Sequence, residues 1–308
     1  MLDSGQVKVD AALSNLSRSF KNNAFVAERI CKILTVAKDS GKFFTYGKQA
    51  FKLINTYRID GTESNRAHLV LGIDTYSCDQ HALSDVVTDK VRRNADPALN
   101  PDFDTTEMLS DLLLLRLEYD VATELATTAR YANSNYTTLS GTSQWSDYSN
   151  SNPLTNIKSA KAVIRALIGR EPNAIVLAGD VAETLSLHPD IKDLRKYTDP
   201  NLLTSAGLPP KILGLEVIEA KATYNKAYEN LTESMSYLWG KNAYVMYMPE
   251  RVGLKSLAPW IIIRENGFRK TKRWREEKVE GDMIEVSDSY DIKEVADECA
   301  YLIVNAIA

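Results

Sequence analysis

The sequence predicts an α+β protein with one excursion that does not pack against its own chain. Two observations carry this prediction. A long apolar-faced helix precedes a compact series of helices and short strands, and residues 39–78 alternate over a length that a lone hairpin cannot bury. The 308 residues, 44% hydrophobic and 25% charged, suffice for two ordinary domains or for one domain with large excursions.

The first part of the chain is a basic arm. Its apolar residues follow helical spacing within residues 20–37, which predicts a short amphipathic helix there. The spacing is set by Val26, Ile30, Ile33, Leu34 and Ala37. Residues 1–58 carry ten Lys and Arg against four Asp and Glu, although the whole chain has a net charge of −4. This surplus indicates either a solvated basic face or an arm that lies on an acidic neighbour or on nucleic acid.

Residues 39–78 predict a long two-stranded excursion around a central turn at 60–64. We expect this hairpin to pack on another chain, because a hairpin of this length finds little to pack against in its own.

A long helix is predicted from Asp104 to Ala132. Asp104 and Glu107 have the spacing of a capping box, and Pro101 lies just before them. Leu113 and Leu117 lie on its apolar stripe and are predicted to be buried. The run Leu112–Leu115 makes the helix apolar nearly all round, which indicates that this part is buried or contacts a neighbour.

The middle of the chain alternates helices and strands. After a polar loop at 132–152, a helix is predicted from Pro153 to a C-cap at Gly169, followed by a buried strand at 174–177 and a helix capped by Asp180 and Glu183. Further strands are predicted at Lys211–Ile218, Ala243–Met248, Trp260–Arg264 and within the tail Asp282–Ala308.

No catalytic, cofactor-binding or metal-ligating residue is predicted. The histidines His68, His81 and His188 have no His or Cys partner at a metal-ligand spacing, and His188-Pro189 is typical of a helix terminus. The cysteines Cys31, Cys78 and Cys299 contain no CxxC, so neither a disulfide framework nor a zinc site is implied. We interpret Asp190 and Asp193 as surface helix carboxylates. An enzyme is therefore not expected.

The densest basic run is Arg269–Arg275, which holds Trp274. A nucleic-acid patch is one interpretation, but the adjoining Glu276 and Glu277 favour a solvated strand or an intersubunit contact. No run of eighteen apolar residues and no signal-peptide core occur, so we expect a chain made in the cytosol without a membrane partner.

Several segments resemble the tailed-bacteriophage major capsid proteins. No single motif is diagnostic of that family, but the order and spacing of the segments together are specific for it. The resemblance is strongest over Gly141–Tyr197. It extends to Thr75–Cys78 with Ala82-Leu83, Arg92–Asp96, Leu112–Arg116 and Tyr237–Lys241.

The resemblance implies the Hong Kong 97-type capsid fold. Residues 1–38 would be the N-terminal arm, 39–78 the extended loop (E-loop), 79–140 with 266–308 the peripheral (P) domain and its spine helix, and 141–265 the axial (A) domain. The implied function is a structural subunit that assembles as pentamers and hexamers into an icosahedral shell around double-stranded DNA. The alternative is an encapsulin-like nanocompartment shell that encloses protein cargo.

The resemblance also implies partners and a location. These are further copies of the chain, a portal, a decoration protein, non-specific contact with packaged DNA, and a virion capsid built in the host bacterial cytoplasm. Because the arm before the hairpin is short, we expect a separate scaffolding protein or none. Lys42, Lys48 and Lys52 are expected to meet the neighbour without covalent crosslinks, and Arg18, Lys21, Arg29 and Lys32 are candidates to face DNA.

Overall fold

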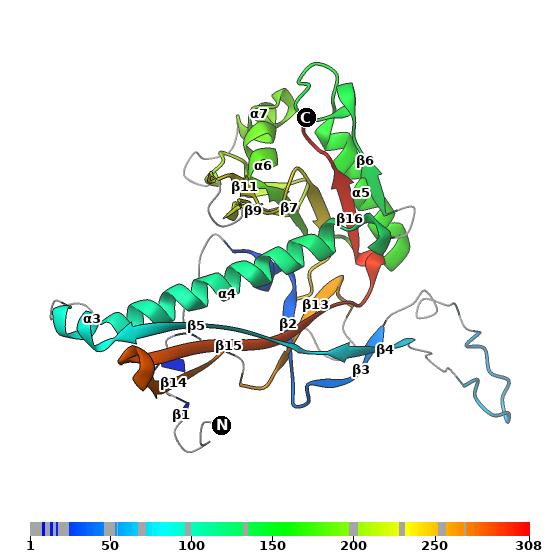
Figure 1. Ribbon diagram of the computed structural model, residues 1–308. Helices are drawn as coiled ribbons and strands as arrows, with labels where there is room; N and C mark the ends of the chain where they lie inside the picture. The colour runs from blue at the N-terminus through cyan, green and yellow to red at the C-terminus, as the bar shows by residue number, and fades with distance from the viewer. Residues whose placement is uncertain are drawn as a thin grey trace.

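Two sheets and one long helix organise the subunit (Figure 1). The computed structural model describes residues 8–9, 13–14, 17, 25–45, 53, 55–66, 72–95, 100–131, 135–196, 203–227, 232–251, 257–267 and 269–308. We call the sheet at the bottom of Figure 1 the lower sheet and the one above it the upper sheet. The helix α4 (Pro101–Ala126) lies across the lower sheet and below the upper body.

The lower sheet is built around β15 (Gly281–Glu294), whose fourteen residues pair with β14, β13 and β5. Its other strands are β1 (Lys8–Val9), β2 (Lys32–Val36), β5 (Asp79–Thr88), β13 (Trp260–Glu265) and β14 (Lys270–Glu276). On the face toward α4, Ile284 and Val286 pack with Leu109 and Leu113. Gly281 has no room for a side chain, since a Cβ would lie 2.8 Å from the Val87 carbonyl oxygen of the neighbouring strand.

The upper sheet runs in the order β6-β16-β12-β7-β9-β8. These strands are β6 (Tyr136–Thr138), β16 (Ala300–Val304), β12 (Ala243–Met246), β7 (Ala174–Ala178), β9 (Leu215–Ala220) and β8 (Lys211–Ile212). Its helices are α5 (Pro153–Ile168), α6 (Gly179–Ser186) and α7 (Pro189–Arg195), and β10 (Thr223–Asn225) with β11 (Met235–Tyr237) forms a separate ribbon. The main core lies here, and β7 and β12 are buried along their whole length.

The predicted two-stranded pairing of the excursion is confirmed at its base, and the described residues 55–66 contain no strand. β3 (Ser40–Thr45) and β4 (Gly72–Ser77) pair antiparallel from Ser40↔Ser77 to Thr45↔Gly72. At the root, Phe43 is buried in a small core with Cys78 and Ile263. The predicted helix at Pro153–Gly169 is also confirmed, with Gly169 in the left-handed conformation (φ 64°) that a C-cap glycine adopts.

The predicted arm helix is largely wrong. Of the described residues of this span, 25–37, only Ala27–Ile30 (α2) is helical, and Lys32–Val36 is the strand β2, which pairs parallel with β13. Three of its five residues, Ile33, Thr35 and Val36, are β-branched and suit a strand. Because β13 offers it a row of backbone partners, tertiary pairing overrides the local helical spacing.

Two predicted caps are also wrong. The long helix begins at Pro101 after the N-cap Asn100 and ends at Ala126, so Asp104 lies in its first turn and does not cap it. Proline suits the first helical position because its missing N–H has no partner there. Helix α6 begins at Gly179 without a side-chain cap, so Asp180 and Glu183 lie inside it.

Three strands join the sheet that does not hold most of the domain predicted for them. Trp260–Glu265, assigned by sequence to the A domain, lies in the lower sheet with β15. Tyr136–Thr138 and Ala300–Val304, assigned to the P domain, lie in the upper sheet, where they pair in parallel. The chain therefore crosses between the sheets after Glu294, through the 3-10 turn Asp297–Cys299.

Glu294, where the chain leaves the lower sheet, is expected to make the stability of the fold depend on pH. Burial, with the nearby charges of Asp297, Glu298 and Glu124, raises the pKa of Glu294 to about 7 against the opposing effect of Arg130. A folded-state pKa above the unfolded one means that stability is lost as pH rises from about 4.5 through about 7, while Glu294 ionises. We expect Glu294→Gln to flatten the pH dependence of the melting temperature across this window.

The measurement is a series of thermal melts between about pH 5 and pH 8. Glu277→Gln, which changes an exposed glutamate, is the control and should keep the wild-type profile. A Glu294→Gln profile as steep as that of the wild type would contradict the assignment.

Candidate assembly interface

The described residues contain no arrangement for metal or thiol chemistry. Among them, no grouping of His, Cys, Asp and Glu side chains could hold a metal ion. Burial raises the pKa of Cys31, and raises that of Cys78 to about 11 and that of Cys299 to about 12, so the three thiols are protonated at neutral pH. Over the same part of the chain, no helix combines the length and apolar character needed to span a bilayer.

The histidines have structural roles where they are described. His188 caps α7, because its Nδ1 accepts the backbone N–H of Asp190 at 3.2 Å, and its Nε2 lies 3.2 Å from Ser151 Oγ. The prediction of a helix-terminus role is thus confirmed. His81 stacks on Tyr290 with ring centroids 4.4 Å apart, and His68 lies outside the described residues.

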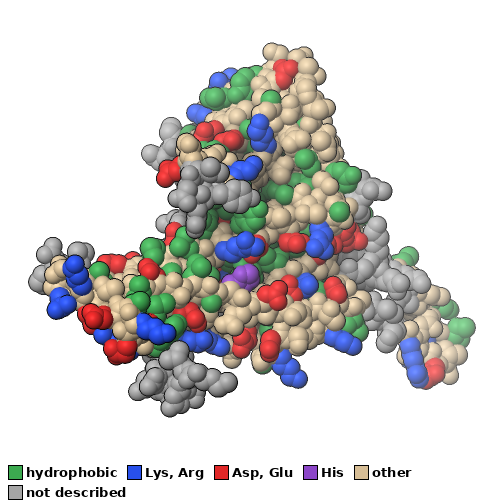
Figure 2. Space-filling model, viewed as in Figure 1, with side chains coloured by type: hydrophobic (Ala, Val, Ile, Leu, Met, Phe, Trp, Pro, Cys, Tyr) green, Lys and Arg blue, Asp and Glu red, His purple; other side chains and the backbone are tan. Residues whose placement is uncertain are grey.

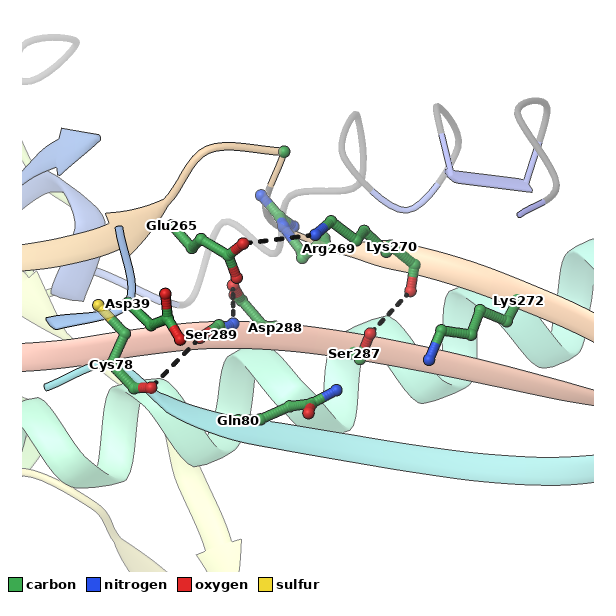
Figure 3. A pocket seen from close by; sticks show the side chains of 11 residues that line it. Asp39, Cys78, Gln80, Glu265, Arg269, Lys270, Lys272, Ser287, Asp288 and Ser289 are labelled. Atoms are coloured by element: carbon green, nitrogen blue, oxygen red, sulfur yellow. Dashed lines mark hydrogen bonds and ion pairs between the residues drawn. The ribbon is translucent and has the colours of Figure 1, made fainter. Parts of the chain in front are cut away.

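A cavity of about 300 Å³ opens beside the root of the hairpin (Figure 3). Several of its polar groups contact one another: Lys270 lies 3.8 Å from Glu265, Ser287 Oγ donates to the Lys270 carbonyl, and Ser289 Oγ donates to the Cys78 carbonyl. Cys78, the only thiol lining it, has a raised pKa. The cavity therefore lies between the hairpin root and the lower sheet, and its thiol is not an activated nucleophile.

The basic run Arg269–Arg275 is neutralised within the subunit. Its ion pairs are Arg269–Glu28, Lys270–Glu265, Lys272–Glu285, Arg273–Asp282 and Arg275–Asp89. Figure 2 shows Lys and Arg interspersed with Asp and Glu over this part of the molecule. Most of the run belongs to the strand β14 of the lower sheet. Because its cations are paired with carboxylates of the same subunit, a structural strand is favoured over a nucleic-acid patch.

The hairpin carries large apolar side chains into solvent. Leu53 is 98% exposed and Tyr57 is 75% exposed, and Ile59 and Ile73 are exposed as well. Two hydrogen bonds close the turn at the tip, since Thr62 N donates to the Ile59 carbonyl and Arg58 Nε donates to the Thr62 carbonyl. Several large apolar side chains exposed together are typical of a surface that a partner covers.

The outer side of α4 is a second exposed apolar surface. Leu113 and Leu117 are buried as predicted, whereas Met108 and Leu112 are exposed, with Leu112 at 46%. Figure 2 shows hydrophobic side chains along this helix on the face toward the viewer. The apolar residues of α4 therefore pack against the lower sheet, pack in the main core, or face solvent.

The described part of the arm docks on its own subunit. β1 pairs antiparallel with β14, Ser14 Oγ accepts from Thr271 N at 3.0 Å, and Ser17 Oγ lies 2.7 Å from Ser110 Oγ of α4. Of the predicted arm and hairpin cations, Arg29 forms an exposed ion pair with Glu216, Lys32 lies in β2, and Lys42 lies in β3. Arg18, Lys21, Lys48 and Lys52 lie outside the described residues.

Two curated relatives are similar over most of the chain. The major capsid protein of Burkholderia phage BcepMu is 28% identical over 253 residues, covering 82% of this chain and 80% of that protein. The major capsid protein of Pseudomonas phage JBD67 is 29% identical over 246 residues, covering 78% and 77%. No family model matches the chain.

Solved structures share the whole fold. A phage-related protein from Bordetella bronchiseptica RB50 superposes with a TM-score of 0.75 at 21% identity, covering 97% of both chains. The capsid of cyanophage P-SCSP1u gives 0.64 at 12% identity, covering 93% of this chain and 89% of that one. The SrpI encapsulin of Synechococcus elongatus PCC 7942 gives 0.57 at 11% identity, covering 96% and 95%.

The long helix across a sheet, the upper body and the two-stranded excursion therefore define the Hong Kong 97-type fold. Within that class, the predicted relationship to the tailed-bacteriophage major capsid proteins is confirmed by both curated relatives.

Proposed function

We propose that the chain is the major capsid protein of a tailed bacteriophage, which assembles as pentamers and hexamers into an icosahedral shell around double-stranded DNA. The observation that carries this proposal is the hairpin, which exposes Leu53, Tyr57 and Ile59 beyond its paired strands. Covering them with a neighbouring copy removes apolar surface from water. The subunit acts as a building block and not as a catalyst.

An encapsulin-like shell around protein cargo is the second candidate. One observation favours it, the likeness to the SrpI encapsulin over 96% of this chain. Sequence similarity favours the phage capsid, because both curated relatives carry that name. Copurifying DNA supports the capsid, and a copurifying cargo enzyme supports the nanocompartment.

The further partners follow from the proposed function. A separate scaffolding protein, a portal and a decoration protein would complete the head, which is built in the host bacterial cytoplasm and becomes part of the virion. The basic balance of residues 1–58 supports a non-specific contact of the arm with packaged DNA or with an acidic neighbour. Lys42, Lys48 and Lys52 would meet the neighbour without covalent crosslinks.

Polar substitution of the hairpin tip should stop assembly without unfolding the subunit. The variant carries Leu53→Ser, Tyr57→Ser and Ile59→Ser. These side chains are exposed in the free subunit, so its melting temperature should stay within about 2 °C of the wild type. The yield of shells, measured by sedimentation, should fall at least about tenfold because three apolar side chains no longer become buried.

Leu213→Asn is the matched control, because it replaces an exposed leucine in the β8–β9 turn, away from the hairpin. It should assemble normally. In parallel, a protease should cut between Thr56 and Arg66 in free subunits and much more slowly in shells. Normal shell yield from the triple variant, or equal cutting in both states, would count against an intersubunit role for the hairpin.

A further inference from the structure

One carboxylate, that of Glu118, lies fully buried inside the main core. Glu118 belongs to α4, between the buried residues Leu117 and Val121. Its oxygens accept three N–H groups: Val26 N at 3.1 Å to each oxygen, Ala27 N at 2.7 Å, and Trp239 Nε1 at 2.7 Å. The bonds therefore join the long helix, the arm at the start of α2 and the loop after β11.

A buried carboxylate is tolerated only where donors replace its hydration. Burial raises the pKa of Glu118, and the three N–H donors oppose that rise. Oε1 is shared by Val26 N and Trp239 Nε1, which come from separate segments. If either donor is lost, the negative charge of Glu118 is less well compensated. Local opening of the fold that lets water reach Glu118 then becomes more favourable.

The ion pairs of α2 each join it to only one part of the fold, either the lower part or the upper sheet. Glu28 of α2 lies 2.8 Å from Arg264 and 3.8 Å from Arg269, both in the lower part of the fold. Arg29 reaches Glu216 of β9 through an ion pair in which both side chains are about half exposed, and such pairs contribute little. The hydrogen bonds that Glu118 accepts from Val26 and Ala27 are buried. The same carboxylate also accepts a hydrogen bond from Trp239, in the loop that leads into β12 of the upper sheet.

We infer that Glu118 is a shared anchor that couples docking of the N-terminal arm to the placement of the upper body, so that release of one weakens the hold on the other. The coupling is reciprocal by thermodynamic necessity, since both donors stabilise the same closed state. This inference concerns the subunit itself and holds whether or not the chain forms a shell.

Hydrogen exchange on the full-length chain tests the inference through Trp239→Phe, which removes the indole donor and keeps an aromatic ring. The reporters are the amides of Arg29, Ile30 and Cys31, whose acceptors Val26 and Ala27 are the residues bound to Glu118. Their exchange should accelerate about tenfold or more, the effect of losing a hydrogen bond to a charged acceptor. Unchanged exchange at these amides would overturn the coupling.

Glu118→Gln completes the cycle and separates the anchor from general loosening. In that background, Trp239→Phe should add little further acceleration at residues 29–31; a full additional effect would overturn the role of Glu118. Glu118→Gln alone should accelerate exchange at these amides and also at Leu238 and Gly240, and a change at one end only would likewise overturn it. This second measurement decides the question if Trp239→Phe does not fold. Arg29→Ala, on the same helix, should leave the Leu238 and Gly240 amides unchanged.

Discussion

Replacing Arg264 with leucine is expected to lower the free energy of unfolding by about 3–5 kcal/mol. Arg264 is fully buried in β13, where its guanidinium lies 2.8 Å from Glu28 and 3.2 Å from Asp288. Asp288 is itself buried, so the substitution leaves a carboxylate in a low-dielectric site without this cation. The substitution also removes the closer of the two ion pairs that Glu28 of α2 makes with the lower part of the fold.

Chemical denaturation followed by circular dichroism measures this effect. Arg29→Ala is the matched control, because it removes an exposed arginine ion pair from α2, the helix that holds Glu28. It should cost no more than about 1 kcal/mol. If Arg264→Leu unfolded at the denaturant concentration of Arg29→Ala, the buried pair would have no net role in stability.

Truncating Leu117 to alanine is expected to cost about 2–5 kcal/mol, as is truncating Leu113. Leu117 is 2% exposed and belongs to the main core, whereas Leu113 packs with Ile284 and Val286 against the lower sheet. Each truncation leaves a cavity that rigid neighbours on both sides fill only partly. Leu112→Ala on the same helix turn should be within about 0.5 kcal/mol of the wild type, because Leu112 is nearly half exposed and lies outside both cores.

The comparison among the three leucines tests which face of α4 is buried. Thermal melts of the free subunit provide the measurement. Equal melting temperatures for Leu112→Ala and Leu117→Ala would show that α4 is rotated from the orientation that buries Leu117 and exposes Leu112.

The elements predicted correctly from the sequence are those with strong local signals. The helix at Pro153 carries a proline at its start, a regular apolar face and a glycine at its end, and the hairpin at 39–78 alternates around a turn. These signals depend on neighbours a few residues away, so the sequence contains them directly. The family resemblance then supplied the arrangement that local patterns leave open.

Distant pairing explains the errors. Lys32–Val36 has apolar residues at spacings that suit one helix face, but it becomes a strand because β13 lies beside it in the folded chain. Ala300–Val304 follows the tail strand in sequence, yet it inserts between β6 and β12 of the other sheet. Neither partner can be chosen from local periodicity alone.

The buried charges were missed, although the sequence carries a signal for them. Glu118 occupies a stripe position with Leu114, Leu117 and Val121, where helical spacing places an apolar residue. Arg264 directly follows the apolar run Trp260–Ile263 of a central strand. A charged residue at a core position predicts a buried partner, but the partner's identity required the fold.

Electron microscopy of the purified full-length chain tests the central claim most directly. We predict closed icosahedral particles, with pentamers and hexamers as the smaller species, because exposed apolar residues of the hairpin and of α4 are then covered by neighbouring copies. A stable, monodisperse monomer at every salt and protein concentration tested would contradict the assignment of this chain as a shell subunit.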